Sequence, residues 1–161
     1  MKLNTNSQAV AYALHQKSDQ DLQNIQTSLR HPSDKSQALA RTCVIIDSEV
    51  DASAALAVCL GMQQGLKVWA AASGEEGLGI IRQVHPALVL VDLKPKGIGG
   101  PALLACIRRL SPRSRIIVLT GWTFDYLESV IREFRVDACC LKPVSVDGVL
   151  QVVGKALNDL S

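Results

Sequence analysis

From residue 41 to the end of the chain, short apolar runs alternate with longer stretches that are amphipathic or rich in alanine and leucine. The apolar runs show little alternation of polar and apolar positions, which is typical of strands buried on both faces of a sheet. The predicted strands are residues 43–47, 67–72, 87–92, 115–121 and 138–143. The predicted helices that follow them are residues 49–62, 73–84, 100–110, 123–134 and 146–160.

Helix-start signals support three of these helices. Ser73 is followed three residues later by Glu76, which is the pattern of a capping box. Pro101 stands at the expected first position of its helix, and Thr123 is a suitable N-cap. Five strands that alternate with five helices predict an α/β fold with a doubly wound, five-stranded parallel sheet.

The first 40 residues differ from the rest and are predicted to form an N-terminal extension. They are rich in Gln, Ser, Asn and Asp, and the polar segment QKSDQD interrupts their apolar spacing. A partner-binding helix over residues 7–29 and a partly disordered segment both fit this pattern. Residues 41–161 are predicted to form one domain.

Composition narrows the classes of function. The net charge of +2 and the absence of a Lys/Arg-rich run give no reason to expect direct nucleic-acid binding. No segment reaches the roughly 20 apolar residues of a membrane span, and the N-terminus has no apolar stretch long enough for a signal peptide. The five cysteines form no C-x-x-C pair and lie in or beside apolar segments, so we expect them to be small core residues of a protein in a reducing compartment. We therefore expect a cytoplasmic protein that does not bind a membrane.

Polar residues follow the predicted strands, at the edge where ligands bind in open parallel sheets. The first strand ends in Asp47, Ser48 and Glu49, and the third ends in Asp92. The fourth ends in Thr120 and the fifth in Lys142. An acid, a hydroxyl and an amine at one edge predict a site for phosphoryl chemistry, in which a cation must offset the repulsion between a carboxylate and a phosphoryl group.

The ordered motifs at the strand ends resemble the receiver domains of two-component response regulators. They are VIID, LVLVDL…G..G, IIVLTG and LKP, and the resemblance covers residues 42–160. It implies a flavodoxin-like fold, bound Mg²⁺ and a phosphoryl group received from a phosphohistidine. It also implies that Asp92 is the phosphoacceptor, that Asp47 is an acid of the metal site, and that Lys94 offers its backbone carbonyl to the metal.

Other residues of the site follow from the chemistry or from the same resemblance. Lys142 can pair with Asp92 when the site is empty and with phosphoryl oxygens when it is filled. Thr120 can donate its hydroxyl to a phosphoryl oxygen and so act as a switch. Cys139 occupies the family's aromatic switch position, and Pro143 is the candidate for a cis peptide bond.

The chain departs from the family pattern, so its acidic pocket is partly degenerate. Ser48 stands where the family has a second acid, with Glu49 one residue further along; an alternative interpretation is that these two residues only cap the first helix. Pro95 comes one position early after Asp92. A usual receiver has three acids and one lysine at this edge, and this chain lacks one of the acids. Its site therefore carries one negative charge fewer, which predicts weak Mg²⁺ binding. Lys94 can either replace part of the metal's charge or hold Asp92 in an ion pair.

Two other functions compete with an active receiver. GIGGPA at residues 97–102 matches a dinucleotide-binding pattern, but it follows the third strand, whereas the fingerprint belongs after the first. The stronger alternative is a degenerate receiver that acts as a phosphorylation-independent interaction module. Mg²⁺ affinity and the reactivity of Asp92 separate these two forms of receiver.

We expect a single-domain response regulator that works through protein contacts. The chain ends directly after the last helix. Its upstream partner is a sensor histidine kinase or a histidine phosphotransfer protein, and downstream it binds a protein target or forms a homodimer through the surfaces of residues 123–134 and 146–160. We expect no enzyme activity beyond, at most, autophosphatase activity.

Overall fold

The computed structural model describes residues 42–121 and 124–158. Five strands make one sheet: β1 (Thr42–Ile46), β2 (Lys67–Ala71), β3 (Leu88–Asp92), β4 (Arg115–Thr120) and β5 (Ala138–Leu141). The helices between and after them are α3 (Val50–Gln64), α4 (Gly74–Val84), α5 (Gly100–Leu110), α6 (Phe124–Phe134) and α7 (Val146–Asn158). Three features of the predicted structure lie outside the described residues: the helix at residues 7–29, the cap Thr123 and the helix end at Leu160.

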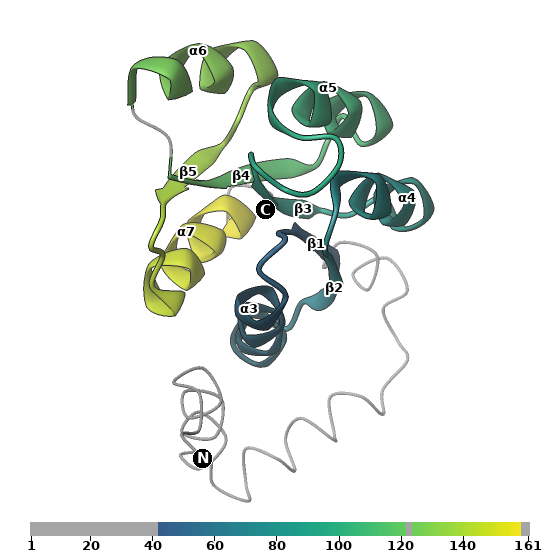
Figure 1. The fold of residues 1–161 in the computed structure, drawn as a ribbon. Helices are drawn as coiled ribbons and strands as arrows, with labels where there is room; N and C mark the ends of the chain where they lie inside the picture. Colours follow the sequence, from purple (N-terminus) through teal and green to yellow (C-terminus); the bar gives the residue numbers. More distant parts are fainter. Residues whose placement is uncertain (1–41, 122–123, 159–161) are drawn as a thin grey trace, which may run out of the picture. The chain divides into compact units, whose positions relative to one another are not determined.

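The strands lie in the order β2-β1-β3-β4-β5, and every neighbouring pair is parallel. This confirms the predicted doubly wound α/β fold, shown in Figure 1. The strand order reverses at β1, because the chain passes first to β2 on one side and then to β3 on the other. The carboxyl ends of β1 and β3 therefore meet at the topological switch point, where doubly wound sheets bind their ligands.

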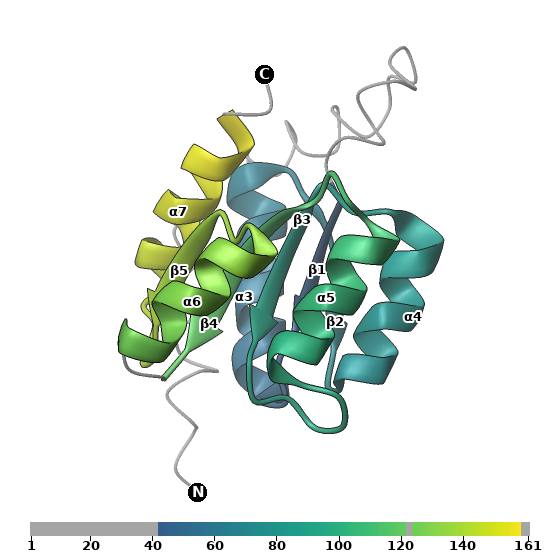
Figure 2. The same ribbon diagram turned by 90° about the horizontal axis from the view of Figure 1, so that it is seen from above.

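Helices cover both faces of the sheet (Figure 2), and an apolar layer lies between the helices and the sheet on each face. Helices α4, α5 and α6 supply Ile81, Leu104 and Val130 to one layer. Helices α3 and α7 supply Leu60 and Val153 to the other. Both faces are buried, which explains why β1 is apolar after Thr42 and β3 is apolar up to Asp92.

Local signals set most helix boundaries. The Ser73 hydroxyl accepts a hydrogen bond from the Glu76 N–H, and the Glu76 carboxylate accepts one from the Ala72 N–H, so α4 begins where the sequence indicates. Helix α3 runs on to Gln64 because Gly65 is the residue in the left-handed conformation that ends it. Pro101 takes the second rather than the first helical position of α5, after Gly100.

The cysteines of the domain are free thiols. Cys43 is buried, while the other four are partly exposed and so are less deeply placed than core residues. Cys139 and Cys140 pack on opposite faces of the sheet, as strand alternation predicts.

Among the helices of residues 42–121 and 124–158, none combines the length and apolar character that crossing a bilayer requires.

Candidate functional site at the carboxyl edge of the sheet

Asp47 and Asp92 have the same local geometry at the ends of neighbouring strands. The Oδ1 atom of Asp47 accepts a hydrogen bond of 2.9 Å from the N–H of Glu49, two residues on. The Oδ1 atom of Asp92 accepts one of the same length from the N–H of Lys94. Such short-range bonds are typical of aspartate where a strand turns into a loop, and they fix each carboxylate. Both residues are buried, so the two carboxylates lie in a site of restricted solvent access.

The second oxygen of each aspartate faces Lys142. Its Nζ atom lies 2.9 Å from Oδ2 of Asp47 and 3.0 Å from Oδ2 of Asp92. A third carboxylate, Oε1 of Glu49, lies 2.9 Å from the same nitrogen. An ammonium group has three donors, so these three contacts match its full hydrogen-bonding capacity. We refer to Asp47, Glu49, Asp92 and Lys142 as the acidic site.

The environment of Lys142 keeps it charged. Burial by itself lowers the pKa of its ammonium group, but the hydrogen bonds to Glu49, Asp47 and Asp92 outweigh this effect. The pKa is therefore raised well above its ordinary value of 10.5. Lys142 is a permanent cation at neutral pH, placed against the two buried carboxylates.

Glu49, rather than Ser48, provides the third carboxylate contact to Lys142. Glu49 is the N-cap residue of α3, but its side chain makes no capping bond and points to Lys142 instead. Its side chain is 64% exposed, compared with 6% for Asp47, so it can move without disturbing the core. The interpretation of Glu49 as only a helix cap is therefore wrong for its side chain.

Thr120 lies beside the acidic site, at the end of the neighbouring strand. It is buried, and it follows Leu119, which pairs with Asp92 between β4 and β3. Its carbonyl accepts a hydrogen bond of 2.8 Å from the N–H of Lys142. The backbone of Lys142 is thus fixed to Thr120 while its side chain reaches the aspartates. The peptide bond between Lys142 and Pro143 is cis.

Cys139 lies on the same face of the sheet as Thr120, two residues before Leu141, the residue that pairs with Thr120. It pairs with Val118, and its side chain packs against the layer under α5 and α6. Burial, with a smaller contribution from Cys140, raises the pKa of its thiol to about 11. The thiol is accordingly neutral at physiological pH and behaves as a small apolar residue at this position.

The residues fit a weakly held cation better than a dedicated metal cage. Within residues 42–121 and 124–158, no three His, Cys, Asp or Glu side chains are arranged as metal ligands. However, Mg²⁺ needs only one or two carboxylates when water and phosphate oxygens complete its shell. Asp47 and Asp92 can provide these two carboxylates if Lys142 moves aside.

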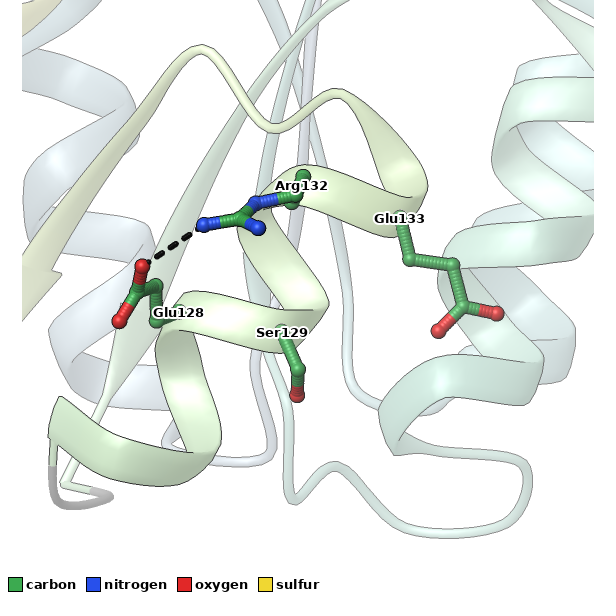
Figure 3. A pocket seen from close by; sticks show the side chains of 4 residues that line it. All are labelled: Glu128, Ser129, Arg132 and Glu133. Atoms are coloured by element: carbon green, nitrogen blue, oxygen red, sulfur yellow. Dashed lines mark hydrogen bonds and ion pairs between the residues drawn. The ribbon is translucent and has the colours of Figure 1, made fainter.

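A separate pocket of about 480 Å³ lies on the surface of α6, away from the acidic site. Figure 3 shows its lining residues, which are Glu128, Ser129, Arg132 and Glu133. Glu128 and Arg132 form an ion pair of 2.8 Å between side chains that are 75% and 81% exposed. Such exposed pairs contribute little binding or stability, so this pocket adds nothing to the site.

Glu75 contacts the loop that follows Asp92, a role that its sequence context does not indicate. Its carboxylate reaches the loop that follows Asp92 and accepts a hydrogen bond from the N–H of Ile98. In the sequence it is one of two consecutive acids at a helix start, and nothing local distinguishes it from Glu76.

The sequence model of the response regulator receiver domain matches residues 43–154, so the chain belongs to this family of two-component signalling domains. Among curated proteins, it is 38% identical over 82 residues to the transcriptional regulatory protein AfsQ1 of Streptomyces coelicolor. That match covers 51% of this chain but only 36% of AfsQ1. It is also 26% identical to sporulation initiation phosphotransferase F of Bacillus subtilis, over 59% of this chain and 77% of that protein.

Solved structures show the same fold. A CheY-like response regulator receiver domain protein from Methanospirillum hungatei is 25% identical, with a TM-score of 0.69 over 74% of this chain and 94% of that one. A response regulator protein from Burkholderia pseudomallei is 24% identical, with a TM-score of 0.64 over 74% of this chain and 70% of that one. That structure contains a phosphorylated aspartic acid and a calcium ion.

Proposed function

We propose that Asp92 accepts a phosphoryl group from a phosphohistidine of a sensor histidine kinase or a histidine phosphotransfer protein. The observation that carries this proposal is the contact of Lys142 Nζ with both buried aspartates at the switch point of the sheet. A carboxylate in such a place can be used as a nucleophile because a cation stands beside it to offset the charge that the phosphoryl group brings.

In the transfer, a carboxylate oxygen of Asp92 forms a bond to phosphorus. The bond between phosphorus and the histidine nitrogen breaks, and the imidazole leaves with the electron pair. Lys142 then exchanges its contact with Asp92 Oδ2 for one with a phosphoryl oxygen. At most, the domain then hydrolyses its own phosphoaspartate by attack of water on phosphorus.

The change of partner at Lys142 provides a switch. Its backbone N–H is bonded to the Thr120 carbonyl, so movement at one residue is transmitted to the other. The Thr120 hydroxyl donates to a phosphoryl oxygen only when that group is present. This contact exists in one state and not in the other, as a shift between two conformations requires. Cys139, on the same face as Thr120, leaves more room for this movement than the family's aromatic residue.

A divalent cation such as Mg²⁺, when bound, neutralises the charge on the phosphoryl oxygens. Asp47, Asp92 and the backbone carbonyl of Lys94 would hold it. Glu49 is the acid available to compensate for Ser48, because its carboxylate already faces the site. We expect weak binding, since Lys142 competes for the same carboxylates.

Exposed apolar residues near the acidic site suit a protein partner. Val50 follows Glu49 and is 58% exposed, while Leu141 and Val146 lie just before and just after the Lys142–Pro143 turn. A phosphohistidine donor has to cover this edge to reach Asp92. By contrast, the described outer surface of α6 is charged at Glu128, Arg132 and Glu133, so docking of a target or of a second copy there would be polar.

A phosphorylation-independent interaction module is the second candidate function. The observation in its favour is that three carboxylates match the full hydrogen-bonding capacity of Lys142. Such a closed network stabilises one state and opposes the change that phosphorylation requires.

Intact-mass measurement after incubation with acetyl phosphate and Mg²⁺ separates the two candidates. A receiver gains one phosphoryl group, the Asp92→Asn variant gains none, and the matched control Asp51→Asn, an exposed acid in the first turn of α3, behaves as the unmodified chain. A chain that gains no phosphoryl group from acetyl phosphate or from a phosphohistidine donor at any Mg²⁺ concentration is a phosphorylation-independent module.

A further inference from the structure

The loop from Leu93 to Gly99, which follows Asp92, is attached to the start of α4. The N–H of Ile98 donates a hydrogen bond of 2.8 Å to Oε1 of Glu75, 23 residues earlier in the chain. The N–H of Gly74 donates one of 3.1 Å to the carbonyl of Lys96. Ser73 and Lys96 form an isolated parallel bridge beside these bonds. Side-chain and backbone contacts together fix the far end of the loop.

The packing at this attachment is close enough to require glycine on both sides. A Cβ atom at Gly97 would overlap the Glu75 carboxylate, and one at Gly74 would overlap the carbonyl of Ile98. Gly97 also has a φ of 76°, in the left-handed region that favours glycine. The carboxylate of Glu75 thus lies directly against the loop backbone.

The near end of the same loop is fixed at the acidic site. The N–H of Lys94 is bonded to Oδ1 of Asp92, and the N–H of Gly100 is bonded to the carbonyl of Leu93 at 2.9 Å. The peptide of Lys94 lies between these bonds and the contact with Glu75. Its carbonyl is the proposed backbone ligand of the cation. The direction of that carbonyl therefore depends on both ends of the loop.

We propose that Glu75 is a positioning residue for the acidic site. By holding Ile98, it fixes the loop so that the Lys94 carbonyl faces the cation beside Asp92. This inference rests on the proposed function for the role of the Lys94 carbonyl. Glu75 is more important here than it would be in a site with three acids. Because Ser48 replaces one acid, the Lys94 carbonyl is a larger share of the remaining metal ligands.

Glu76 provides a matched control. It lies in the same first turn of α4 and has the same charge, and it also holds the start of the helix through its capping bond. Its carboxylate, however, accepts from the N–H of Ala72 and does not reach the loop. An effect seen with Glu75→Ala and absent with Glu76→Ala is therefore an effect on the loop and not on helix stability.

The test measures Mg²⁺ affinity by calorimetry and protection of the Ile98 amide from hydrogen exchange by NMR. In Glu75→Ala, we expect Ile98 to lose protection and the Mg²⁺ dissociation constant to rise about tenfold, as is common when the partner of a ligand-bearing group is removed. Glu75→Gln, which keeps an acceptor oxygen, should recover part of both effects. Glu76→Ala should change neither.

Three outcomes overturn the proposal. They are equal changes in Glu75→Ala and Glu76→Ala, loss of Ile98 protection without a change in Mg²⁺ affinity, and an unmodified chain that binds no Mg²⁺. If instead the chain binds Mg²⁺ in a Glu75-dependent manner but is never phosphorylated, the proposed function fails and the positioning role stands. The two ideas are therefore tested separately.

Discussion

The Nζ atom of Lys142 lies 3.0 Å from Oδ2 of Asp92, although 50 residues separate them in the chain. The parallel sheet produces this contact, because it brings the carboxyl ends of β3 and β5 to one edge across the single intervening strand β4. The same nitrogen also holds Asp47 and Glu49. One cation thus offsets three carboxylates that would otherwise repel one another.

Replacing Lys142 with methionine should destabilise the domain. The change keeps most of the side chain's volume but leaves Asp47 and Asp92 without their cation. We expect the free energy of unfolding to fall by about 2 kcal/mol, less than for a fully buried ion pair because the Lys142 side chain is 21% exposed. Urea denaturation measures this, with Lys155→Met, an exposed lysine of α7, as the control. Added Mg²⁺ should restore part of the loss, and an equal loss in both variants would contradict this explanation.

The contribution of Lys142 to stability should be lost at strongly alkaline pH. Its pKa is raised in the folded state above the ordinary 10.5, so its stabilising effect is fully present below about pH 10 and is lost as the pH rises through the raised value. The difference in unfolding free energy between the unmodified chain and Lys142→Met should be constant from pH 7 to 9 and should shrink above about pH 10.5. A difference that grows with pH would have the wrong sign.

Restoring an acid at residue 48 should strengthen metal binding. Ser48→Asp adds a carboxylate beside Asp47, at the position where the family has its second acid. We expect Mg²⁺ affinity to rise about tenfold, because each additional carboxylate increases the affinity of an oxygen-ligand site. Ser48→Asn has nearly the same shape without the charge and should leave the affinity unchanged in calorimetry. Equal affinities in the two variants would show that charge at this position does not limit binding.

Arg108 should be important for stability at the opposite edge of the sheet. Its guanidinium donates hydrogen bonds to the carbonyls of Phe134, Pro112, Ser114 and Arg135, which join the loop before β4 to the end of α6. Arg108→Met should lower the free energy of unfolding by about 2 kcal/mol, since the part-buried carbonyls of Phe134 and Ser114 lose a charged donor. Arg109→Met, at the exposed neighbouring position, should change it by less than about 0.5 kcal/mol. Similar losses in urea denaturation would refute the role of these bonds.

The strands and most helix boundaries could be predicted because they depend on local patterns. Buried parallel strands are continuous apolar runs, and Ser73 and Gly65 have local roles in beginning and ending helices. The alignment of Asp47, Asp92 and Lys142 also followed from topology, since parallel strands end at a common edge.

Side-chain direction was harder to predict. The sequence places Glu49 near the site but does not show whether its side chain caps the helix or contacts Lys142. The choice between these two roles depends on the side-chain rotamer. The link between Glu75 and Ile98 depends on how closely a loop approaches a helix 23 residues away. No periodicity encodes such an approach, although Gly74 and Gly97 are the residues that permit it.

The most direct test of the proposed function is to locate the phosphoryl group. Borohydride reduction converts a phosphorylated aspartate into homoserine, which peptide mass spectrometry assigns to one residue. A phosphorylated glutamate would give 5-hydroxynorvaline instead. After incubation with acetyl phosphate and Mg²⁺, we predict homoserine at residue 92, no homoserine at residue 47 and no 5-hydroxynorvaline at residue 49. A reduced product at residue 47 or 49, or at none of the three, would contradict the assignment of Asp92 as the phosphoacceptor.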